Sequence, residues 1–123
     1  MAVPKSVIPE AELEVLKVLW LQQPLTSRDL AQRLYGEVNR TSMGTVQKLI
    51  TRLEEKGMVR RDRSTSVHQF SAVVTQEEIA GMQLDDFASK LSGGSLSPFV
   101  VHLVQANRLS KKEKEQIRRL LEG

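Results

Sequence analysis

Apolar side chains recur at helical spacing along most of this chain, which predicts a mainly α-helical fold. The first helix is expected to begin at Pro9, because proline lacks only an N–H group that a helix start leaves unpaired anyway. Its apolar stripe includes Trp20, which we expect to lie in the core rather than to stack on a base. Pro24 blocks continuation, so this helix is expected to end at Gln22–Gln23.

Two further helices follow with a short joint between them, the arrangement of a helix-turn-helix motif. Thr26 and Asp29 are spaced as a capping box, which predicts the start of the second helix. Gly36 is expected to end it, because glycine tolerates the backbone conformation that closes a helix. The polar residues Glu37–Arg40 are then expected to form the turn that leads into the third helix.

The third helix lies in RTSMGTVQKLITRLEEKGMVRRDR, residues 40–63, where Thr41 or Ser42 is expected to cap it. Apolar side chains then follow one face, and amide and basic side chains follow the other. Gly57 is expected to end the helix, and Met58–Arg61 to form the first strand of a hairpin. A helix with a polar leading face followed by a basic hairpin is typical of a winged helix-turn-helix DNA-binding domain.

The hairpin is expected to pass through a polar loop, Asp62–Ser66, into a second strand over Val67–Val73. Apolar and polar side chains alternate in that second strand, as they do in a half-buried strand. Phe70 is expected to anchor the hairpin to the helices. The sequence therefore predicts a small antiparallel β wing attached to three helices.

Residues 75–123 return to helical spacing and are expected to form a helical dimerisation domain, separate from a DNA-binding domain of residues 1–74. Thr75 and Ser110 are expected to begin its first and last helices as capping boxes, and Ser97 to cap its middle helix, with Pro98 as the first helical residue. These helices carry more apolar surface than a short tail needs, so a second copy of the chain is the expected partner. The side chains expected in that homodimer interface are Phe87, Leu91, Phe99, Val100, Leu103, Val104, Ile117, Leu120 and Leu121.

The net charge of +3 is unevenly distributed along the chain. Residues 40–63 carry seven Lys or Arg side chains against three Asp or Glu, whereas residues 76–123 carry seven of each. A basic patch on a near-neutral body favours an anionic partner, with an ordinary solvated face as the alternative. The residues expected to bind DNA are Ser42, Gly44, Thr45, Gln47, Lys48, Arg52, Arg60, Arg61 and Arg63.

These residues are expected to act in different ways. The hydroxyl groups of Ser42 and Thr45, near the start of the helix, are suited to bind phosphate oxygens. Gln47 and Lys48 can reach base edges, while Arg52 and the three wing arginines are suited to the phosphate backbone. Gly44 costs about 1 kcal/mol relative to alanine inside a helix. It either lets the backbone approach DNA closely or is a tolerated substitution, and the sequence favours neither alternative.

The composition excludes several other kinds of chemistry. There is no cysteine, which excludes disulfides and thiolate metal sites. The two histidines are isolated, and neighbouring carboxylates on a helix do not face each other. We therefore expect no enzyme activity, no cofactor and no metal site. No apolar run approaches the roughly 18 residues of a membrane span, so we expect a cytoplasmic protein without membrane insertion.

Four segments of the chain, EAELEVLKVLW, LTSRDLAQRL, TSMGTVQKLITRLEEKGMVRR and GGSLSPFVVHLV, occur in the order found in one bacterial family. With them, nearly the whole chain resembles the penicillinase-repressor family (BlaI/MecI/CopY) of winged-helix regulators. The resemblance implies a dimeric transcriptional repressor. Its winged helix would bind a palindromic operator in double-stranded DNA, and its C-terminal helices would form the dimer.

In the β-lactam-responsive members, a membrane sensor metallopeptidase pathway leads to cleavage in the tail, which weakens the dimer and releases DNA. The cleaved bond joins Asn and Phe there, and the matching positions here are His102 and Leu103. Copper-responsive members bind metal through tail cysteines, which this chain lacks. A rival interpretation is a winged-helix adaptor whose basic face binds an acidic protein, a function that needs no two-fold symmetry.

Overall fold

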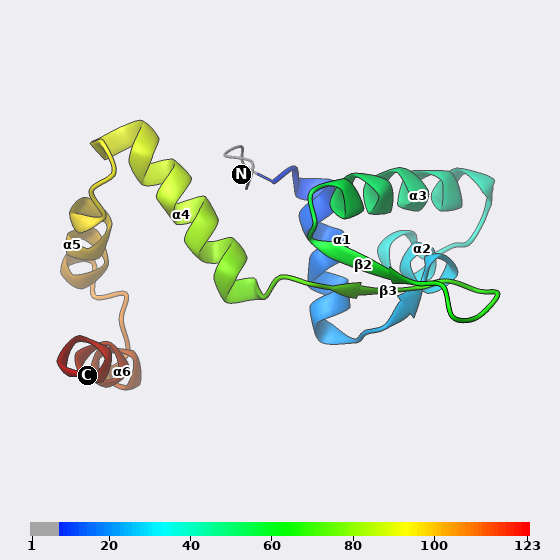
Figure 1. Cartoon of the computed structure of the whole chain (residues 1–123). Helices are drawn as coiled ribbons and strands as arrows, with labels where there is room; N and C mark the ends of the chain where they lie inside the picture. Colours follow the sequence, from blue (N-terminus) through cyan, green and yellow to red (C-terminus); the bar gives the residue numbers. More distant parts are fainter. Residues whose placement is uncertain (1–7) are drawn as a thin grey trace. The chain divides into compact units, whose positions relative to one another are not determined.

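The computed structural model describes residues 8–123, which form a mainly helical fold with a small antiparallel sheet, as the sequence predicts (Figure 1). The described elements are, in order, α1 (Glu10–Leu21), β1 (Leu25–Thr26), α2 (Ser27–Tyr35), α3 (Arg40–Glu55), β2 (Val59–Asp62), β3 (Gln69–Ala72), α4 (Gln76–Ser92), α5 (Ser97–Gln105) and α6 (Lys111–Glu122). They divide into two compact units between Leu84 and Asp85, inside α4. A functional boundary after residue 74 stays a prediction.

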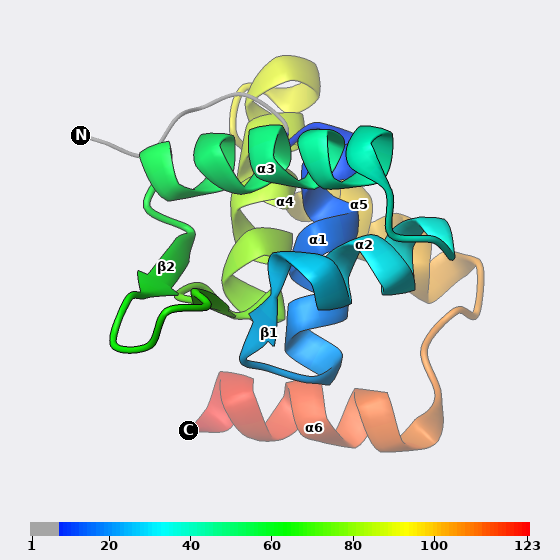
Figure 2. The ribbon, with the colours of Figure 1, turned by 90° about the vertical axis from the view of Figure 1, so that its right-hand side faces the viewer.

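One apolar core holds the first unit together. Helices α1, α2 and α3 contact one another, and Figures 1 and 2 both show α1 and α2 on the same side of α3. Phe70 from β3 is 1% exposed, so the expected anchor of the hairpin is confirmed. The core side chains are Ile8, Val15, Leu16, Leu19, Leu25, Leu30, Ala31, Val46, Leu49, Ile50, Leu53, Met58, Val59, Phe70 and Ile79.

Two polar contacts fix elements at the margin of this core. The carboxylate of Glu12, in α1, is 2% exposed and accepts a hydrogen bond from the ammonium group of Lys56 at 2.5 Å, just after α3. Because a charge buried without a partner is costly, this pair favours one position of α1 against the end of α3. Trp20 packs against the core, and its indole N–H donates to the carbonyl oxygen of Val74 at 2.9 Å.

The sheet has the strand order β1-β3-β2, and both pairs are antiparallel. The strand expected over Met58–Arg61 is shifted by one residue, to Val59–Asp62, and the strand expected over Val67–Val73 is shortened to Gln69–Ala72. The strand β1, Leu25–Thr26, has only two residues and is too short for its alternation to be recognised in a sequence. The hairpin β2–β3, residues 59–72, is called the wing below.

Two expected helix caps are wrong. Asn39 caps α3: its side-chain oxygen accepts from the amide of Ser42 at 2.8 Å, and the Ser42 hydroxyl accepts from the amide of Asn39 at 3.0 Å. This reciprocal box places Ser42 at the third helical position and Arg40 inside the helix. In the second unit Leu96 occupies the cap position of α5 without a side-chain cap, so Ser97 is already helical.

Three capping boxes that the sequence predicts are confirmed. Thr26 and Asp29 exchange hydrogen bonds at 3.0 and 3.1 Å at the start of α2. The pairs that begin with Thr75 and Ser110 do the same for α4 and α6. Gly36 ends α2 with φ of 75°, a left-handed conformation that glycine adopts without steric cost. Thr26 and Gly36 thus mark the two ends of α2.

Candidate nucleic-acid interface

Helix α3 is buried along one side and exposed along the other. Val46, Leu49, Ile50 and Leu53 pack into the core. The opposite side, called the recognition face below, is exposed at Gly44, Gln47, Lys48, Thr51 and Arg52. A short helix that is held rigidly on its apolar side and presents amide and basic groups on the other is suited to the major groove of DNA.

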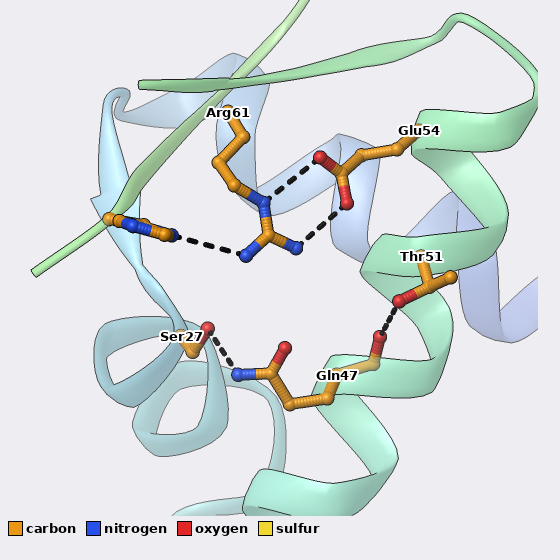
Figure 3. A network of polar contacts seen from close by, with 6 residues as sticks. Ser27, Gln47, Thr51, Glu54 and Arg61 are labelled. Atoms are coloured by element: carbon orange, nitrogen blue, oxygen red, sulfur yellow. Dashed lines mark hydrogen bonds and ion pairs between the residues drawn. The ribbon is translucent and has the colours of Figure 1, made fainter. Parts of the chain in front are cut away.

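The Gln47 side chain is tied to the neighbouring helix of the motif. Its amide nitrogen donates to the hydroxyl oxygen of Ser27, the first residue of α2, at 3.1 Å (Figure 3). The Thr51 hydroxyl donates to the backbone oxygen of Gln47 at 2.8 Å, and the Thr45 hydroxyl donates in the same way to Thr41 at 3.0 Å. The Gln47 contact joins the two helices of the motif at the side chain that the sequence predicts to reach a base.

Ser42 is more buried than its predicted contact with phosphate requires. The residue is 6% exposed. Its hydroxyl takes part in the cap of α3 and lies 3.0 Å from the backbone oxygen of Glu37. Internal contacts thus occupy this hydroxyl, whereas Gly44 and Lys48 are open to solvent.

Arg61 is also held in internal contacts, although the sequence groups it with two other wing arginines. Its guanidinium group donates to both carboxylate oxygens of Glu54, in α3, at 3.0 and 2.8 Å (Figure 3). The same group lies 3.2 Å from the Nδ1 atom of His68 and 4.8 Å from the ring centroid of Phe70. Hydrogen bonding by Arg61 lowers the pKa of the Glu54 carboxyl below its ordinary value. Arg61 therefore joins the wing to α3.

Arg60 and Arg63, unlike Arg61, are exposed to solvent. Successive residues of a strand face opposite sides, so the inward position of Arg61 leaves Arg60 outward. Both Arg60 and Arg63 are exposed, and among residues 8–123 neither forms an ion pair with a carboxylate. They are the two wing cations that are free to meet a phosphate backbone.

A hollow of about 310 Å³ lies where the recognition face, the start of α2 and the wing meet. Its lining includes Ser27, Arg28, Gln47, Arg61 and His68. The structure thus brings together residues that are far apart in the sequence at the site where base and backbone contacts would adjoin. Ser27 is not among the site residues that the sequence predicts, because its signal is a hydrogen bond across 20 positions of the chain.

The second unit exposes a large apolar surface. Most side chains of α5 are apolar, yet within the described part of the chain no residue of this helix is buried. Phe87 and Phe99 pack against each other within the unit, with ring centroids 5.5 Å apart. The apolar side chains most exposed on α4, α5 and α6 are Phe87, Leu91, Val100, Val101, Val104, Leu120 and Leu121. Val101, 48% exposed, is the member of this set that the sequence prediction omits.

His102 and Leu103 lie inside α5 and are exposed. Within residues 8–123, no three histidine or carboxylate side chains are grouped in a way that could hold a metal ion. In the same part of the chain, none of the helices has the length and apolar character needed to cross a membrane.

The sequence profile of the penicillinase repressor family matches residues 8–123. The chain belongs to the penicillinase repressor family. This membership makes it a DNA-binding transcriptional repressor and not an enzyme. The recognition face and the wing are therefore the surfaces to consider for DNA in this family member.

The chain aligns with curated relatives over nearly the whole of its length and of theirs. The chain is 26% identical over 114 residues to the methicillin resistance regulatory protein MecI of Staphylococcus aureus strain N315, covering 93% of this chain and 92% of that protein. It is 28% identical over 116 residues to the penicillinase repressor of Staphylococcus aureus, covering 93% and 90%. A MarR family protein from Bacillus stearothermophilus shares the fold, with a TM-score of 0.50 and 22% identity over 84% of this chain and 73% of that one.

Proposed function

We propose that two copies of this chain bind one palindromic operator in double-stranded DNA and block transcription from it. The observation that carries this proposal is the recognition face: the second helix of a helix-turn-helix pair exposes its amide and basic groups while its other side is fixed in the core. Each copy would place one α3 in the major groove of one half-site. A palindrome matches the two-fold symmetry of such a pair.

The contacts would divide between bases and backbone. Gln47 and Lys48 lie on the exposed side of α3 and would contact base edges. Arg52, Arg60 and Arg63 would contact phosphates, which provides affinity without sequence preference. Arg61 would contribute through the wing position that it fixes, because its guanidinium group already binds Glu54.

The second unit would join the two copies. Val100 and Val104, one helical turn apart on α5, are each 55% exposed. Exposed apolar side chains in such number favour burial against an equally apolar surface, and a second copy offers the same surface by symmetry. Joining two DNA-binding units raises the effective concentration of the second once the first is bound. Affinity for the operator then depends on the dimer.

Release would follow from a signal that acts on this tail. A cut between His102 and Leu103 would separate the end of α5 and all of α6 from the rest of the chain. It would thereby remove Val104, Leu120 and Leu121 from the dimer interface without removing a DNA contact. Family resemblance supports a membrane sensor metallopeptidase pathway as the source of such a cut.

A selection experiment tests the proposal. The full chain is incubated with a library of random-sequence duplexes, and the bound duplexes are sequenced. We expect an inverted repeat with half-sites about 10 base pairs apart, or a multiple of that spacing. Binding to the selected duplex should weaken as salt rises, with a log–log slope of about −0.9 per phosphate contact. Enrichment of no sequence, together with binding to an acidic protein, would instead support an adaptor.

A further inference from the structure

The hydroxyl group of Ser27 has no part in capping the helix that it begins. Thr26 supplies the cap of α2, since its hydroxyl accepts from the amide of Asp29 at 3.0 Å. Ser27, one residue later, instead directs its hydroxyl oxygen to the carboxamide of Gln47 (Figure 3). A residue without a capping role thus holds a side chain of the recognition face.

The bond leaves Gln47 with a defined set of free groups. One N–H of the carboxamide is donated to Ser27, which leaves the amide oxygen and the second N–H. An oxygen acceptor together with an N–H donor is the combination that pairs with the N6 and N7 atoms of adenine in the major groove. The Ser27 hydroxyl accepts in this bond, so its own hydrogen stays available to another acceptor.

The bond also limits the freedom of a flexible side chain. Glutamine has three rotatable side-chain bonds, so a free carboxamide can turn to present its oxygen and its N–H groups in either order. A carboxamide that Ser27 holds in one orientation presents a single order, which matches one base edge and mismatches others. Arg61 and His68 line the same hollow, but among residues 8–123 Ser27 is the side chain that hydrogen-bonds the Gln47 carboxamide.

We propose that Ser27 is a positioning residue for sequence recognition, which orients the Gln47 carboxamide toward its base pair. The inference rests on the proposed function, because it needs α3 to lie in the major groove. It adds to that function a residue outside α3 that determines specificity. Ser27 would act through Gln47 and not through a base of its own.

A double-mutant cycle on the full chain tests this role. Ser27→Ala, Gln47→Ala and the double variant are measured against the duplex selected by the wild type and against each single-base-pair change in it. We expect Ser27→Ala to lower discrimination by about 3- to 10-fold, the ratio that one neutral hydrogen bond typically produces. The loss should occur only at the base pair where Gln47→Ala also relaxes discrimination. Ser27→Ala should have no further effect in the Gln47→Ala background.

Two matched variants separate positioning from other roles. Ser27→Thr keeps the hydroxyl and should restore discrimination, whereas Ser66→Ala removes a hydroxyl from the same hollow and should leave it unchanged. Since Thr26 caps α2, Ser27→Ala should melt at nearly the wild-type temperature. An equal loss on all duplexes in both backgrounds, as a phosphate contact would give, overturns the inference, and so does no loss at all. A wild type that selects no sequence overturns the proposed function itself.

Discussion

Arg61 of the wing and Glu54 of α3 form a two-pronged ion pair, with nitrogen–oxygen distances of 3.0 and 2.8 Å (Figure 3). The guanidinium group also lies over the buried ring of Phe70, at 4.8 Å. Parallel hydrogen bonds from arginine to a carboxylate fix orientation as well as distance. The wing is thus held against the helix that carries the recognition face, so the wing and the recognition face keep one relative position.

Replacing Arg61 by lysine should weaken this link, because an ammonium group cannot bind both carboxylate oxygens in the same plane. Both partners are partly exposed, so we expect the free energy of unfolding to fall by only about 1 kcal/mol. Amide hydrogen exchange in β2 and β3 should accelerate. Arg60→Lys is the matched control, since Arg60 is exposed and should tolerate the change without loss of stability. Equal stability of the two variants would remove Arg61 from this role.

Glu54 should make part of the stability depend on pH. Hydrogen bonding by Arg61 holds the pKa of the Glu54 carboxyl in the folded state below its ordinary value of 4.5. The folded state therefore binds fewer protons at this site than the unfolded state, so the contribution is complete above pH 4.5 and is lost as pH falls through the folded-state pKa. In denaturant titrations, the stability difference between wild type and Glu54→Gln should shrink below pH 4.5. A difference that stays constant from pH 7 to pH 3 would contradict this prediction.

Arg60 and Arg63 should contribute to DNA affinity without affecting sequence preference. Each phosphate contact adds about 0.9 to the salt slope of binding, so Arg60→Ala with Arg63→Ala should lower the slope by about 1.8. The measurement is the dissociation constant at several salt concentrations on the selected duplex and on an unrelated one. Lys17→Ala, which removes an exposed cation from α1, should leave the slope unchanged. An unchanged slope in the double variant would place the wing away from DNA.

Gly44 can be tested by adding one methyl group. A Cβ atom at this position would meet no atom of the chain within 4 Å. Gly44→Ala should therefore raise the free energy of unfolding by about 0.5–1 kcal/mol, as alanine does inside a helix. DNA affinity should fall, because the methyl group would lie between the α3 backbone and DNA. Gly81→Ala in α4 is equally unhindered and should stabilise the chain without affecting DNA binding. Unchanged affinity in Gly44→Ala would make Gly44 a tolerated substitution.

Local signals in the sequence predicted most of this fold. The capping box at Thr26, the glycine after α2 and the apolar spacing of α3 each depend on residues within a few positions of one another. The residue that caps α3 was harder to predict from the sequence, because Thr41 and Ser42 are both good capping residues. Asn39 is the cap because Ser42, at the third helical position, also accepts a hydrogen bond from the Asn39 amide. This pairing can be recognised only once the first residue of the helix is known.

The candidate site was less predictable, because its arrangement depends on contacts between distant residues. The sequence presents Arg60, Arg61 and Arg63 as equivalent cations, but strand alternation turns Arg61 to the opposite side from Arg60, and Arg63 lies beyond the end of β2. Its partner Glu54 can be identified only once β2 lies beside α3. The bond between Ser27 and Gln47 likewise exists only in the packed helix-turn-helix pair.

Counting the chains on one operator tests the central claim, that the recognition face works in pairs joined by the tail. Sedimentation of the full chain with the selected duplex should give two chains per duplex. Val100→Glu with Val104→Glu should give one, with affinity reduced by about 100-fold or more as the effective concentration is lost. Gln105→Glu, which adds charge at a polar position of α5, should bind as the wild type does. One wild-type chain per duplex, or full affinity in the double valine variant, would contradict the account.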